Sequence, residues 1–518
     1  APRSGSHPAV DGKNPRETDV YTVNDGRLTG VYTADGQVEV FCGVPYAKPP
    51  VGELRWKEPQ DPDKWTGILK ADRFAPMSMQ TSYPQVVASL VDLVAYHQFK
   101  PELFGRKERM SEDSLYLNVW KPAGEAKDLP VLVYVHGGSL QTGQPWYADY
   151  SGEGLARQGV IVVNMGYRLG VYGFYADEEL KAESEHGTTG NYGLLDQIKA
   201  LEWVKNNVSA FGGDPSNVTL AGESAGAACV SALLTSPLAQ GLFRRAVIES
   251  STVTAPEPAH SYRSLEQAYE TGKELKKRVG ASTVDELRVL DAKAILSGTN
   301  DNHHLTIDGY VLTEPPYESL KKGICNAEEI FHGYNAKEGN LFILLDPVNL
   351  KSYEQKVRTL FGKGADKVLE LSPASTEKEA KENWQILHSA FFFEYGHVCL
   401  TRQAQACGVP VYEYFFTKEN KRLGGNHGGE EVYLYGNLDK YPRHYGVSDR
   451  ALAGVTTAYM ANFIKTGDPN GAGLPEFPRA QDPAKTFEFG EQIGSVDRRH
   501  TELFAVMDEL YGFETKKP

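Results

Sequence analysis

The segment 218–226 constrains this chain most, because it joins a strand-like run, a tight turn and a helix of small residues. It reads Val-Thr-Leu-Ala-Gly-Glu-Ser-Ala-Gly, so that a Gly-x-Ser-x-Gly motif follows an apolar run. A serine hydroxyl is a weak nucleophile that has to stand clear of the backbone, and a sharp bend between a strand and a helix exposes it. The bend brings strand and helix close together, so only small residues such as Gly222, Ala225 and Gly226 fit beside Ser224. The segment therefore predicts a nucleophile elbow at Ser224.

The order of the other apolar segments predicts an α/β fold with a large, mostly parallel central sheet. Short strand-like runs separated by Asn-Asp-Gly and Ala-Asp-Gly turns come first and indicate a small antiparallel edge near the N-terminus. Strands then alternate with helices, which favours a parallel sheet flanked by helices on both faces. The predicted strands are residues 20–23, 30–32, 37–42, 115–120, 130–135, 160–164, 218–221, 246–249 and 408–415, and the predicted helices are residues 190–208 and 225–234.

Composition excludes several classes of protein. The net charge of −14 over 518 residues argues against a nucleic-acid surface, which needs a basic footprint. No apolar stretch approaches the ~18 residues of a membrane span, so we expect a soluble protein, either cytoplasmic or secreted after removal of a leader. The five cysteines are odd in number and contain no Cys-x-x-Cys pair, which disfavours a disulfide framework or a zinc site. Cys229, just past the elbow, is expected to be a core residue.

We expect one domain over residues 18–512, followed by a tail over 513–518. Residues 1–17 are rich in Pro, Gly, Ser and charge, which predicts a poorly ordered segment, either a leader or a cloning remnant. Residues 82–110 form an insertion with an amphipathic stretch over 88–97 that is a candidate cover for a pocket.

A serine nucleophile needs a histidine to take its proton and an acid to orient that histidine, and after an elbow the order along the chain is serine, acid, histidine. His427 is the best candidate base, because it lies in the glycine-dense run Gly-Gly-Asn-His-Gly-Gly, which can bring an imidazole close to a substrate. The adjacent His303 and His304 could suggest a metal, but neighbouring side chains on an extended chain point apart and no third ligand is evident.

Two carboxylates compete for the role of the acid. Glu338 lies shortly after the apolar run 329–331 and so just past the end of a predicted strand. Asp308, followed by Gly309, is a rival, although Asp-Gly is more often simply a turn.

The third requirement is an oxyanion hole made of backbone N–H groups. Ala225, directly after the nucleophile, should supply one donor. The others should come from the loop His-Gly-Gly-Ser at 136–139, which follows the predicted strand 130–135, so we assign them to Gly138 and Ser139.

Beyond this chemistry, the chain resembles the type-B carboxylesterase/lipase family, the cholinesterase-like α/β-hydrolases, and in character the bacterial carboxylesterases such as p-nitrobenzyl esterase. The resemblance extends over residues 18–512 and rests on many runs in the same order. They include Phe-Cys-Gly-Val-Pro-Tyr-Ala at 41–47, Glu-Asp-Ser-Leu-Tyr-Leu-Asn-Val at 112–119, Tyr-Arg-Leu-Gly at 167–170 and Phe-Gly-Gly-Asp-Pro at 211–215.

The resemblance implies an α/β-hydrolase fold and a triad of Ser224, Glu338 and His427, which selects Glu338 over Asp308. It also places Glu223 and Ser250 directly behind the triad. By the same resemblance, Arg55 and Glu112 form a buried ion pair that holds the region of the oxyanion loop.

The chain departs from the family pattern at two places. Where the family usually has a third glycine in the oxyanion loop, this chain has Ser139, which tolerates fewer backbone angles. Where many members join two cysteines by a disulfide, this chain has Ser78 and Ser114, so the early loop is expected to be unstapled and mobile.

The expected function is that of a serine carboxylic-ester hydrolase that forms an acyl-enzyme on small to medium or aromatic esters, without metal or cofactor. A feruloyl-type esterase and a catalytically silent binding or adhesion protein are the alternatives. Trp146, Tyr147 and Tyr150 follow the oxyanion loop and suggest an aromatic pocket wall, although buried aromatic residues are more often simple packing. The expected partner is a small-molecule ester, and the sequence leaves the oligomeric state open.

Overall fold

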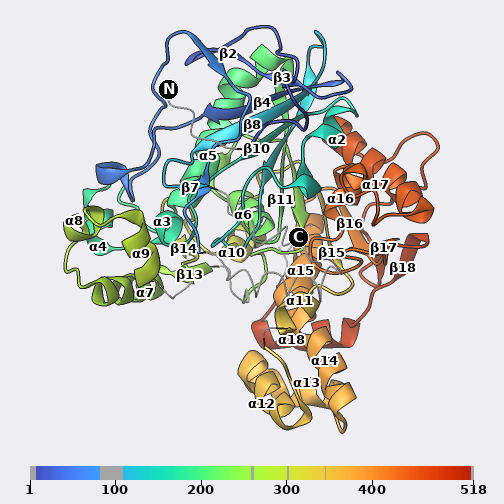
Figure 1. The fold of residues 1–518 in the computed structure, drawn as a ribbon. Coiled ribbons are helices and arrows are strands. Elements are labelled where there is room, and N and C mark those ends of the chain that lie inside the picture. Colours follow the sequence, from blue (N-terminus) through green and yellow to red (C-terminus); the bar gives the residue numbers. More distant parts are fainter. Residues whose placement is uncertain (1–6, 82–108, 258–261, 300–302, 345, 515–518) are drawn as a thin grey trace.

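A computed structural model describes residues 7–81, 109–257, 262–299, 303–344 and 346–514. Its centre is a sheet in which eleven strands of the described chain are hydrogen-bonded side by side (Figure 1). From one edge to the other the strands are β18 (Ile493–Asp497), β17 (Lys485–Phe489), β16 (Val411–Phe416), β15 (Glu329–Asn335), β12 (Arg245–Glu249), β11 (Gly213–Glu223), β9 (Leu129–Val135), β10 (Ile161–Met165), β8 (Tyr116–Pro122), β4 (Val38–Pro45) and β3 (Val31–Tyr32).

The pairing of the strands confirms the predicted mixture of parallel and antiparallel neighbours. The run from β10 through β9, β11, β12, β15 and β16 to β17 is parallel throughout. The N-terminal strands β3, β4 and β8 pair antiparallel, and β8 joins the parallel part through an antiparallel contact with β10. The fold is therefore the α/β-hydrolase arrangement that the sequence predicts.

Alternate residues of the central strands feed two separate cores, as the two-residue period of a strand requires. Val131, Val133 and Val135 of β9 pack with helices α5 (Tyr192–Asn207) and α6 (Ala225–Leu233) on one face. Leu132 and Tyr134 pack on the other face, where α2 (Glu153–Ala156), α16 (Glu431–Leu434) and α17 (Val447–Thr466) lie. Both faces of the sheet are thus covered by helices.

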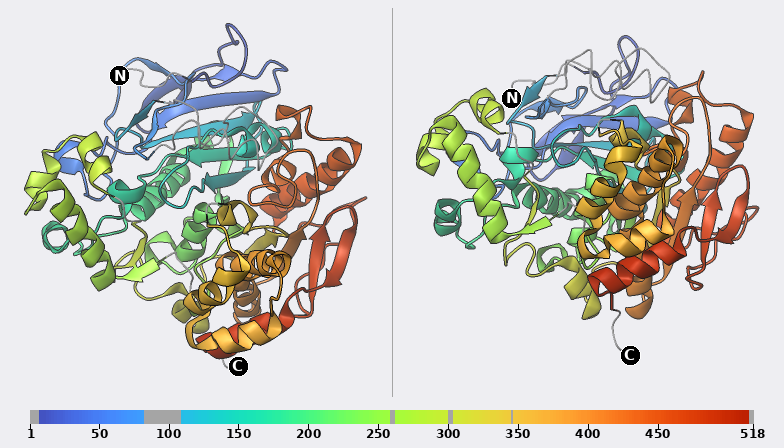
Figure 2. Two further views of the ribbon diagram at one scale, coloured as in Figure 1. Left: turned by 60° about the horizontal axis from the view of Figure 1, so that its bottom comes forward. Right: turned by 90° about the horizontal axis from the view of Figure 1, so that it is seen from below.

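A third group of helices lies at the lower end of the molecule in Figure 1, beyond the sheet. Segments far apart in the sequence meet there around one apolar cluster, and Figure 2 shows them from two further sides. They are α12 (Leu350–Phe361), α13 (Ala365–Leu371), α14 (Glu377–Ser389), a π-helical turn (Ala390–Glu394), α15 (Tyr395–Ala406) and α18 (Thr501–Tyr511).

The remaining elements are short, except for the 15-residue helix α7. The helices are α3 (Gly170–Phe174), α4 (Glu178–Glu183), α7 (Leu265–Val279), α8 (Val284–Arg288), α9 (Ala292–Gly298), α10 (Pro316–Lys321) and α11 (Asn340–Ile343). Three small sheets pair β1 (Tyr21–Val23) and β5 (Ile68–Lys70) with β2 (Gly26–Thr29), β6 (Met77–Ser78) with β7 (Met110–Ser111), and β13 (Tyr262–Ser264) with β14 (Leu305–Ile307).

Two details of the N-terminal region differ from the sequence prediction. Strand β1 belongs to a separate small sheet with β2 and β5, because the Asn-Asp-Gly turn folds it onto β2 instead of onto the edge of the large sheet. Pro8 and Glu17 form β-bridges to Arg73 and Val31, and Ala9 and Val10 are buried, so this part of the segment 1–17 packs against the fold although its composition is polar.

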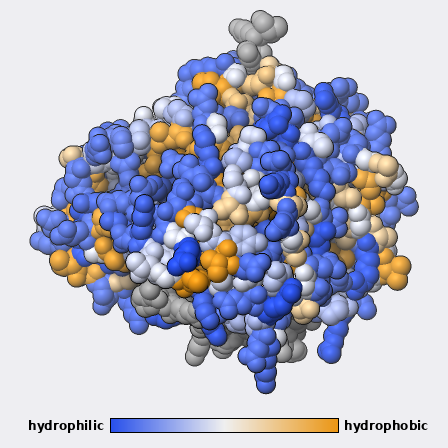
Figure 3. All heavy atoms as spheres, turned by 90° about the horizontal axis from the view of Figure 1, so that it is seen from above, coloured by the Kyte–Doolittle hydropathy of each residue, from blue (hydrophilic) through white to orange (hydrophobic). Residues whose placement is uncertain are grey.

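The face shown in Figure 3 is mostly hydrophilic, with apolar side chains in small groups. Within the described residues, no helix has the length and apolar character needed to cross a membrane. The candidate cover over residues 82–110 lies almost entirely outside the described residues.

Candidate active site

Ser224 stands at the bend between the end of β11 and the start of α6. Its backbone has φ 56° and ψ −125°, a region that non-glycine residues rarely adopt. Its N–H donates a hydrogen bond to the carbonyl oxygen of Glu249 at 2.9 Å, which fixes the bend against the neighbouring strand β12. The elbow predicted from the sequence is therefore present in the fold, with the strained backbone that such a bend produces.

Close packing explains the small residues around this serine. A Cβ atom at Gly226 would lie 2.0 Å from the carbonyl oxygen of Val135, and one at Gly222 would lie 2.5 Å from the carbonyl carbon of Gly226. Both distances are far below a van der Waals contact, so a larger residue would push α6 away from β9 and from its own strand.

The structure brings Glu338 and His427 together. The Oε2 atom of Glu338 lies 2.5 Å from Nδ1 of His427, and the Glu338 side chain is completely buried. The backbone N–H of Asn335, the last residue of β15, donates to Oε1 of Glu338 at 2.7 Å. One carboxylate oxygen of Glu338 is thus bound by the backbone at the end of β15, and the other contacts the imidazole of His427.

The other ring nitrogen of His427 faces the elbow. Its Nε2 atom lies 3.2 Å from Oε1 of Glu223, the residue before Ser224. Neither of these two atoms has a hydrogen-bond partner in the described part of the chain, and no hydrogen bond joins Ser224 to His427 there. The histidine loop and the elbow therefore meet at Glu223, and Nε2 is left available to an incoming group.

Two phenylalanines that the sequence analysis did not single out pack on the imidazole. The ring centroids of Phe342, in α11, and Phe393, in the π-helical turn, lie 5.3 and 4.9 Å from that of His427. Phe342 remains 36% exposed, so the apolar surface beside the histidine is open to solvent. Its place four residues after Glu338, and the Phe-Phe-Phe run at 391–393, are signals that the sequence did contain.

Asp308, the alternative candidate for the acid, forms hydrogen bonds within a local turn and, among the described residues, not with His427. Its carboxylate accepts hydrogen bonds from the N–H groups of Val311 and Leu312 at 3.0 and 2.8 Å and from the hydroxyl of Thr188. These contacts close a local turn, which is the ordinary role of an Asp-Gly pair.

The three N–H groups predicted for the oxyanion hole have no acceptor in the described part of the chain. They belong to Gly138, Ser139 and Ala225. The loop that carries the first two is closed by the N–H groups of Gln141 and Thr142, which both donate to the carbonyl oxygen of Gly138 at 2.9 Å. Unpaired amides beside an elbow are the donors that a developing oxyanion requires.

Ser139 itself adopts the left-handed region, with φ 57°. The position where this chain departs from the family's glycine thus keeps the backbone conformation that favours glycine. The preceding His136 is a neutral support of the loop, because burial lowers its pKa to about 4. Its carbonyl oxygen accepts a hydrogen bond of 2.7 Å from Tyr167.

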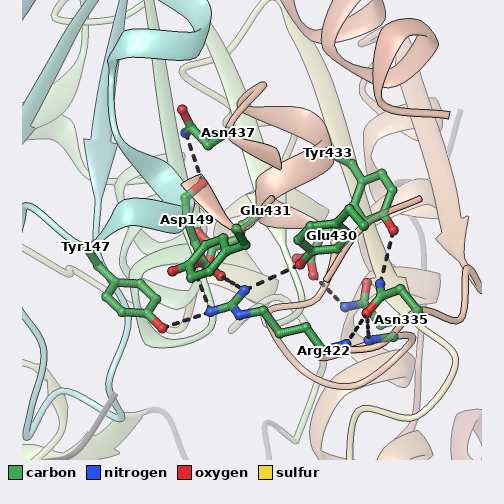
Figure 4. A network of polar contacts seen from close by, with 12 residues as sticks. Tyr147, Asp149, Asn335, Arg422, Glu430, Glu431, Tyr433 and Asn437 are labelled. Atoms are coloured by element: carbon green, nitrogen blue, oxygen red, sulfur yellow. Dashed lines mark hydrogen bonds and ion pairs between the residues drawn. The ribbon is translucent and has the colours of Figure 1, made fainter. Parts of the chain in front are cut away.

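Four glutamates near the site are buried, and Figure 4 shows two of them, Glu430 and Glu431, in a network of polar contacts. Burial first, and then the neighbouring carboxylates, raises the pKa values of Glu223, Glu249 and Glu431 well above their ordinary value and that of Glu430 to about 7. Neutral donors contact three of them: Tyr134 donates to Glu431 at 2.5 Å, Tyr435 donates to Glu249 at 2.6 Å, and Ser250 and Asn335 donate to Glu430 at 3.3 and 2.5 Å. Ser250 therefore supports the loop after His427 instead of touching the three predicted catalytic residues.

The expected ion pair between Arg55 and Glu112 is confirmed, with Nε–Oε1 and Nη2–Oε2 distances of 2.7 and 2.9 Å. Ser78 and Ser114, which cannot form a disulfide, are in contact with each other. Their hydroxyl oxygens lie 2.9 Å apart, and the Ser78 hydroxyl also donates to the carbonyl oxygen of Tyr167 at 2.7 Å. A hydrogen bond thus connects the two positions at which the family resemblance implies a disulfide in many members.

Two of the three aromatic residues after the oxyanion loop are packed in the core. Trp146 is buried and stacks on Phe74 at 5.4 Å, and Tyr150 stacks on Tyr134 at 4.5 Å. Tyr147 accepts a hydrogen bond from Arg422. Cys229 lies in the core as expected, and all five cysteines are free.

Metal ligands are not grouped in the described part of the chain, where no three His, Cys, Asp or Glu side chains are placed to hold an ion. His303 is buried, and its Nε2 atom lies 3.3 Å from the hydroxyl of Thr299. The chemistry available at the site is that of a hydroxyl, an imidazole, carboxylates and backbone amides.

Comparison with known proteins gives the same picture over nearly the whole length. The model of the carboxylesterase family matches residues 17–503. The fumonisin B1 esterase of Sphingopyxis macrogoltabida is 33% identical over 494 residues, which cover 91% of this chain and 86% of that protein. The para-nitrobenzyl esterase of Bacillus subtilis is 33% identical over 469 residues, with 87% and 90% covered.

Solved structures agree in fold as well as in sequence. The carboxylesterase of Geobacillus stearothermophilus superimposes with a TM-score of 0.80 at 32% identity and covers 94% of this chain and 100% of its own. A PNB esterase superimposes with a TM-score of 0.79 at 29% identity, with 94% and 99% covered. The chain belongs to the carboxylesterase family and is a serine carboxylic-ester hydrolase.

Proposed function

We propose that Ser224, His427 and Glu338 form the catalytic triad, which hydrolyses esters of small to medium or aromatic acids through an acyl-enzyme. The observation that carries the proposal is the state of His427. One ring nitrogen is held by a buried carboxylate, and the other lies 3.2 Å from Glu223 Oε1, directly before Ser224, with no hydrogen-bond partner among the described residues. This is the arrangement that a base needs in order to take a proton from a serine hydroxyl.

In the first half of the reaction Ser224 Oγ attacks the ester carbonyl while His427 Nε2 accepts the hydroxyl proton. The carbonyl oxygen becomes an anion that the N–H groups of Gly138, Ser139 and Ala225 bind. His427 then gives the proton to the leaving alcohol. In the second half, water attacks the acyl group with His427 again as base, which releases the acid and restores Ser224. Glu338 orients the imidazole and stabilises its protonated form.

The choice of apolar or aromatic esters rests on Phe342 and Phe393. Both rings lie against the imidazole, and the ring of Phe342 leaves apolar surface exposed beside it. An aromatic ring on the substrate gains about 0.5–1.5 kcal/mol from such a pair beyond its burial. Phe342→Ala should therefore lower kcat/KM for phenyl and hydroxycinnamate esters more than for acetate esters.

The test is a fluorophosphonate probe combined with Ser224→Ala. The probe should label the wild type with one adduct, which peptide mass spectrometry locates at Ser224, and the variant should neither be labelled nor turn over p-nitrophenyl acetate. A panel of acyl chain lengths plus methyl ferulate, scored by kcat/KM, then identifies the preferred acid. Retention of most activity by Ser224→Ala would exclude the proposed nucleophile.

A further inference from the structure

Arg422 is an unusual residue to find so close to a catalytic loop, because its guanidinium is entirely inside the protein. It lies five positions before His427, and its side chain is 0% exposed, against 2% for its partner Asp149. In Figure 4 the two side chains reach toward each other from different parts of the chain. They are 273 residues apart in sequence.

Both carboxylate oxygens of Asp149 accept hydrogen bonds. Arg422 Nη1 donates to Asp149 Oδ2 at 2.8 Å and Nη2 donates to Oδ1 at 3.0 Å. Tyr441 donates its hydroxyl to Asp149 Oδ1 at 2.5 Å, and the guanidinium lies 3.8 Å above the ring of the same tyrosine. Nη2 also donates to the hydroxyl of Tyr147 at 2.9 Å. A bidentate fork of this kind fixes direction as well as distance.

The two partners come from the two segments whose relative position the proposed reaction depends on. Asp149 lies in a 3₁₀ turn (Ala148–Tyr150), ten residues after Ser139 of the oxyanion loop. Arg422 lies in the loop between β16 and α16 that carries His427. Asn437 adds a contact to the backbone of the turn, since its Nδ2 atom donates to the carbonyl oxygen of Asp149 at 3.1 Å.

The opposite side of the histidine loop is held in another way. The backbone N–H of Lys337 donates to the carbonyl oxygen of Gly425 at 2.9 Å, and Asn335 Nδ2 donates to the carbonyl oxygen of Asn426 at 2.9 Å. These bonds tie His427 to the segment of Glu338. They leave its position relative to the oxyanion side to be set by contacts such as the one between Arg422 and Asp149.

We propose that Arg422 and Asp149 are a positioning pair, which sets the place of the His427 loop relative to the oxyanion-hole segment and thereby the rate of proton transfer. The inference rests on the proposed function of Ser224, His427 and Glu338. Neither partner touches the substrate. Misplacement of a reacting group by about 1 Å costs about 100-fold in rate, so loosening this clamp acts on kcat far more than on KM.

The test is a double-mutant cycle with Asp149→Asn and Arg422→Met. Asparagine keeps the shape of aspartate but not its charge, and methionine fills part of the space of the arginine. Each single variant should lower kcat for p-nitrophenyl acetate by about 10–100-fold with KM changed less than about 3-fold. The double variant should be no slower than the slower single, because both remove the same interaction. All rates are measured at least about 20 °C below the melting temperature of each variant.

Glu39→Gln supplies a matched control. Glu39 and Lys121 form an equally buried ion pair, 2.5 Å apart with side chains 2% exposed, on strands β4 and β8 away from the site. Its loss should lower the melting temperature and leave kcat unchanged. If Arg422→Met fails to fold, Arg422→Lys keeps a charge in the site but not the fork and should show the same fall in kcat.

Unchanged kcat in folded Asp149→Asn, with only a lower melting temperature, would reduce the pair to a structural role and overturn the proposal. A lower kcat/KM that arises only from a higher KM, with kcat unchanged, would also overturn the proposal. Failure of the proposed function is seen separately, because it shows as activity in Ser224→Ala or as a fluorophosphonate adduct elsewhere, whatever the cycle gives.

Discussion

At the scale of single residues, three serines in the left-handed backbone region mark where the fold accepts strain. They are Ser139, Ser224 and Ser250, with φ values of 57°, 56° and 59°. Each such residue costs about 1–3 kcal/mol, and it persists only when the surroundings determine it. All three lie in or directly beside the predicted site. Five other described residues that are not glycine also have a positive φ, namely Asn14, Trp56, Asp128, Leu140 and His500. Strain is therefore not confined to the site, but these three serines place part of it where the backbone has to present a hydroxyl and several amides.

Ser139 allows a test of which part of the residue matters. In Ser139→Gly the same amide remains and the left-handed conformation becomes free of strain, while the unfolded chain gains entropy, so the free energy of unfolding should stay within about 1 kcal/mol of the wild type. Turnover of short esters should also be retained. Ser139→Val places a branched side chain in the same conformation and should lose about 1–2 kcal/mol of stability and most of the activity. Denaturant unfolding and kcat measure both effects, and a large loss of kcat in Ser139→Gly would show that the hydroxyl takes part.

At the scale of elements, the contact between α6 and β9 determines how closely the elbow approaches the oxyanion loop. Gly226→Ala would place a methyl group 2.0 Å from the carbonyl oxygen of Val135, directly before that loop. We expect a loss of at least about 2 kcal/mol of stability, as for overpacking against rigid backbone, together with a fall in kcat. Thermal unfolding and steady-state kinetics at low temperature separate the two.

Gly454 provides the control for this substitution. It lies inside the long helix α17, and a Cβ atom there would meet nothing within 4 Å. Gly454→Ala should therefore raise the free energy of unfolding by about 0.5–1 kcal/mol, from helix propensity alone, and leave kcat unchanged. If Gly226→Ala proved as stable as Gly454→Ala, the helix would have to be free to move away from the sheet.

The hydrogen bond between Ser78 and Ser114 can be replaced by a covalent link. Their hydroxyl oxygens lie 2.9 Å apart and close a loop of 36 residues. In the double variant Ser78→Cys and Ser114→Cys, an oxidised loop of this length should add about 3–4 kcal/mol of stability by restricting the unfolded chain. The melting temperature with and without reductant measures the gain. Thiols that stay reduced under oxidising conditions would contradict the inferred proximity, and a disulfide that forms without raising the melting temperature would contradict the expected gain.

The sequence predicted the main helices and strands and the candidate residues of the proposed triad, because both leave short local patterns in the chain. The strand predicted at 218–221 is the buried end of β11, and the helix predicted at 190–208 is α5 with its flanks. Ser224 and His427 could be chosen as candidates from short motifs and their order, whereas Glu338 was selected over Asp308 by the family resemblance. The pairing of Arg422 with Asp149, or of Glu249 with Tyr435, could not be predicted, because the partners lie 273 and 186 residues apart and no local pattern connects them.

At the scale of the whole molecule, buried histidines and buried glutamates act on stability in opposite directions. Burial lowers the pKa values of His136 and His500 to about 4 and those of His303 and His332 to about 3. An unfolded histidine, with a pKa near 6.5, takes up a proton that the folded state refuses. Stability from these groups is therefore complete above about pH 6.5 and is lost as the pH falls toward 4 and 3.

The glutamates have the reverse effect. Burial raises the pKa values of Glu394 and Glu430 to about 7 and those of Glu223, Glu249 and Glu431 further. The folded state keeps protons that the unfolded chain releases above about pH 4.5. Their contribution to stability is thus complete below that pH and declines as the pH rises to 7 and beyond.

Because the two sets have opposite slopes between about pH 4.5 and 6.5, the free energy of unfolding should reach a plateau there and fall on both sides. Each group changes the free energy of unfolding by about 1.4 kcal/mol per pH unit where its protonation differs between the folded and unfolded states.

Two variants test this profile. Glu249→Gln removes one carboxyl group with a raised pKa and should flatten the decline in stability above pH 6.5, while His303→Asn should flatten the decline below pH 4.5. Urea unfolding of the wild type and both variants at pH 4, 5.5, 7 and 8.5 measures these slopes. Stability of the wild type that rises from pH 5.5 to 8.5 would mean that the buried glutamates are ionised in the folded protein, and the four glutamates near the site would then have to hold several negative charges without a cation.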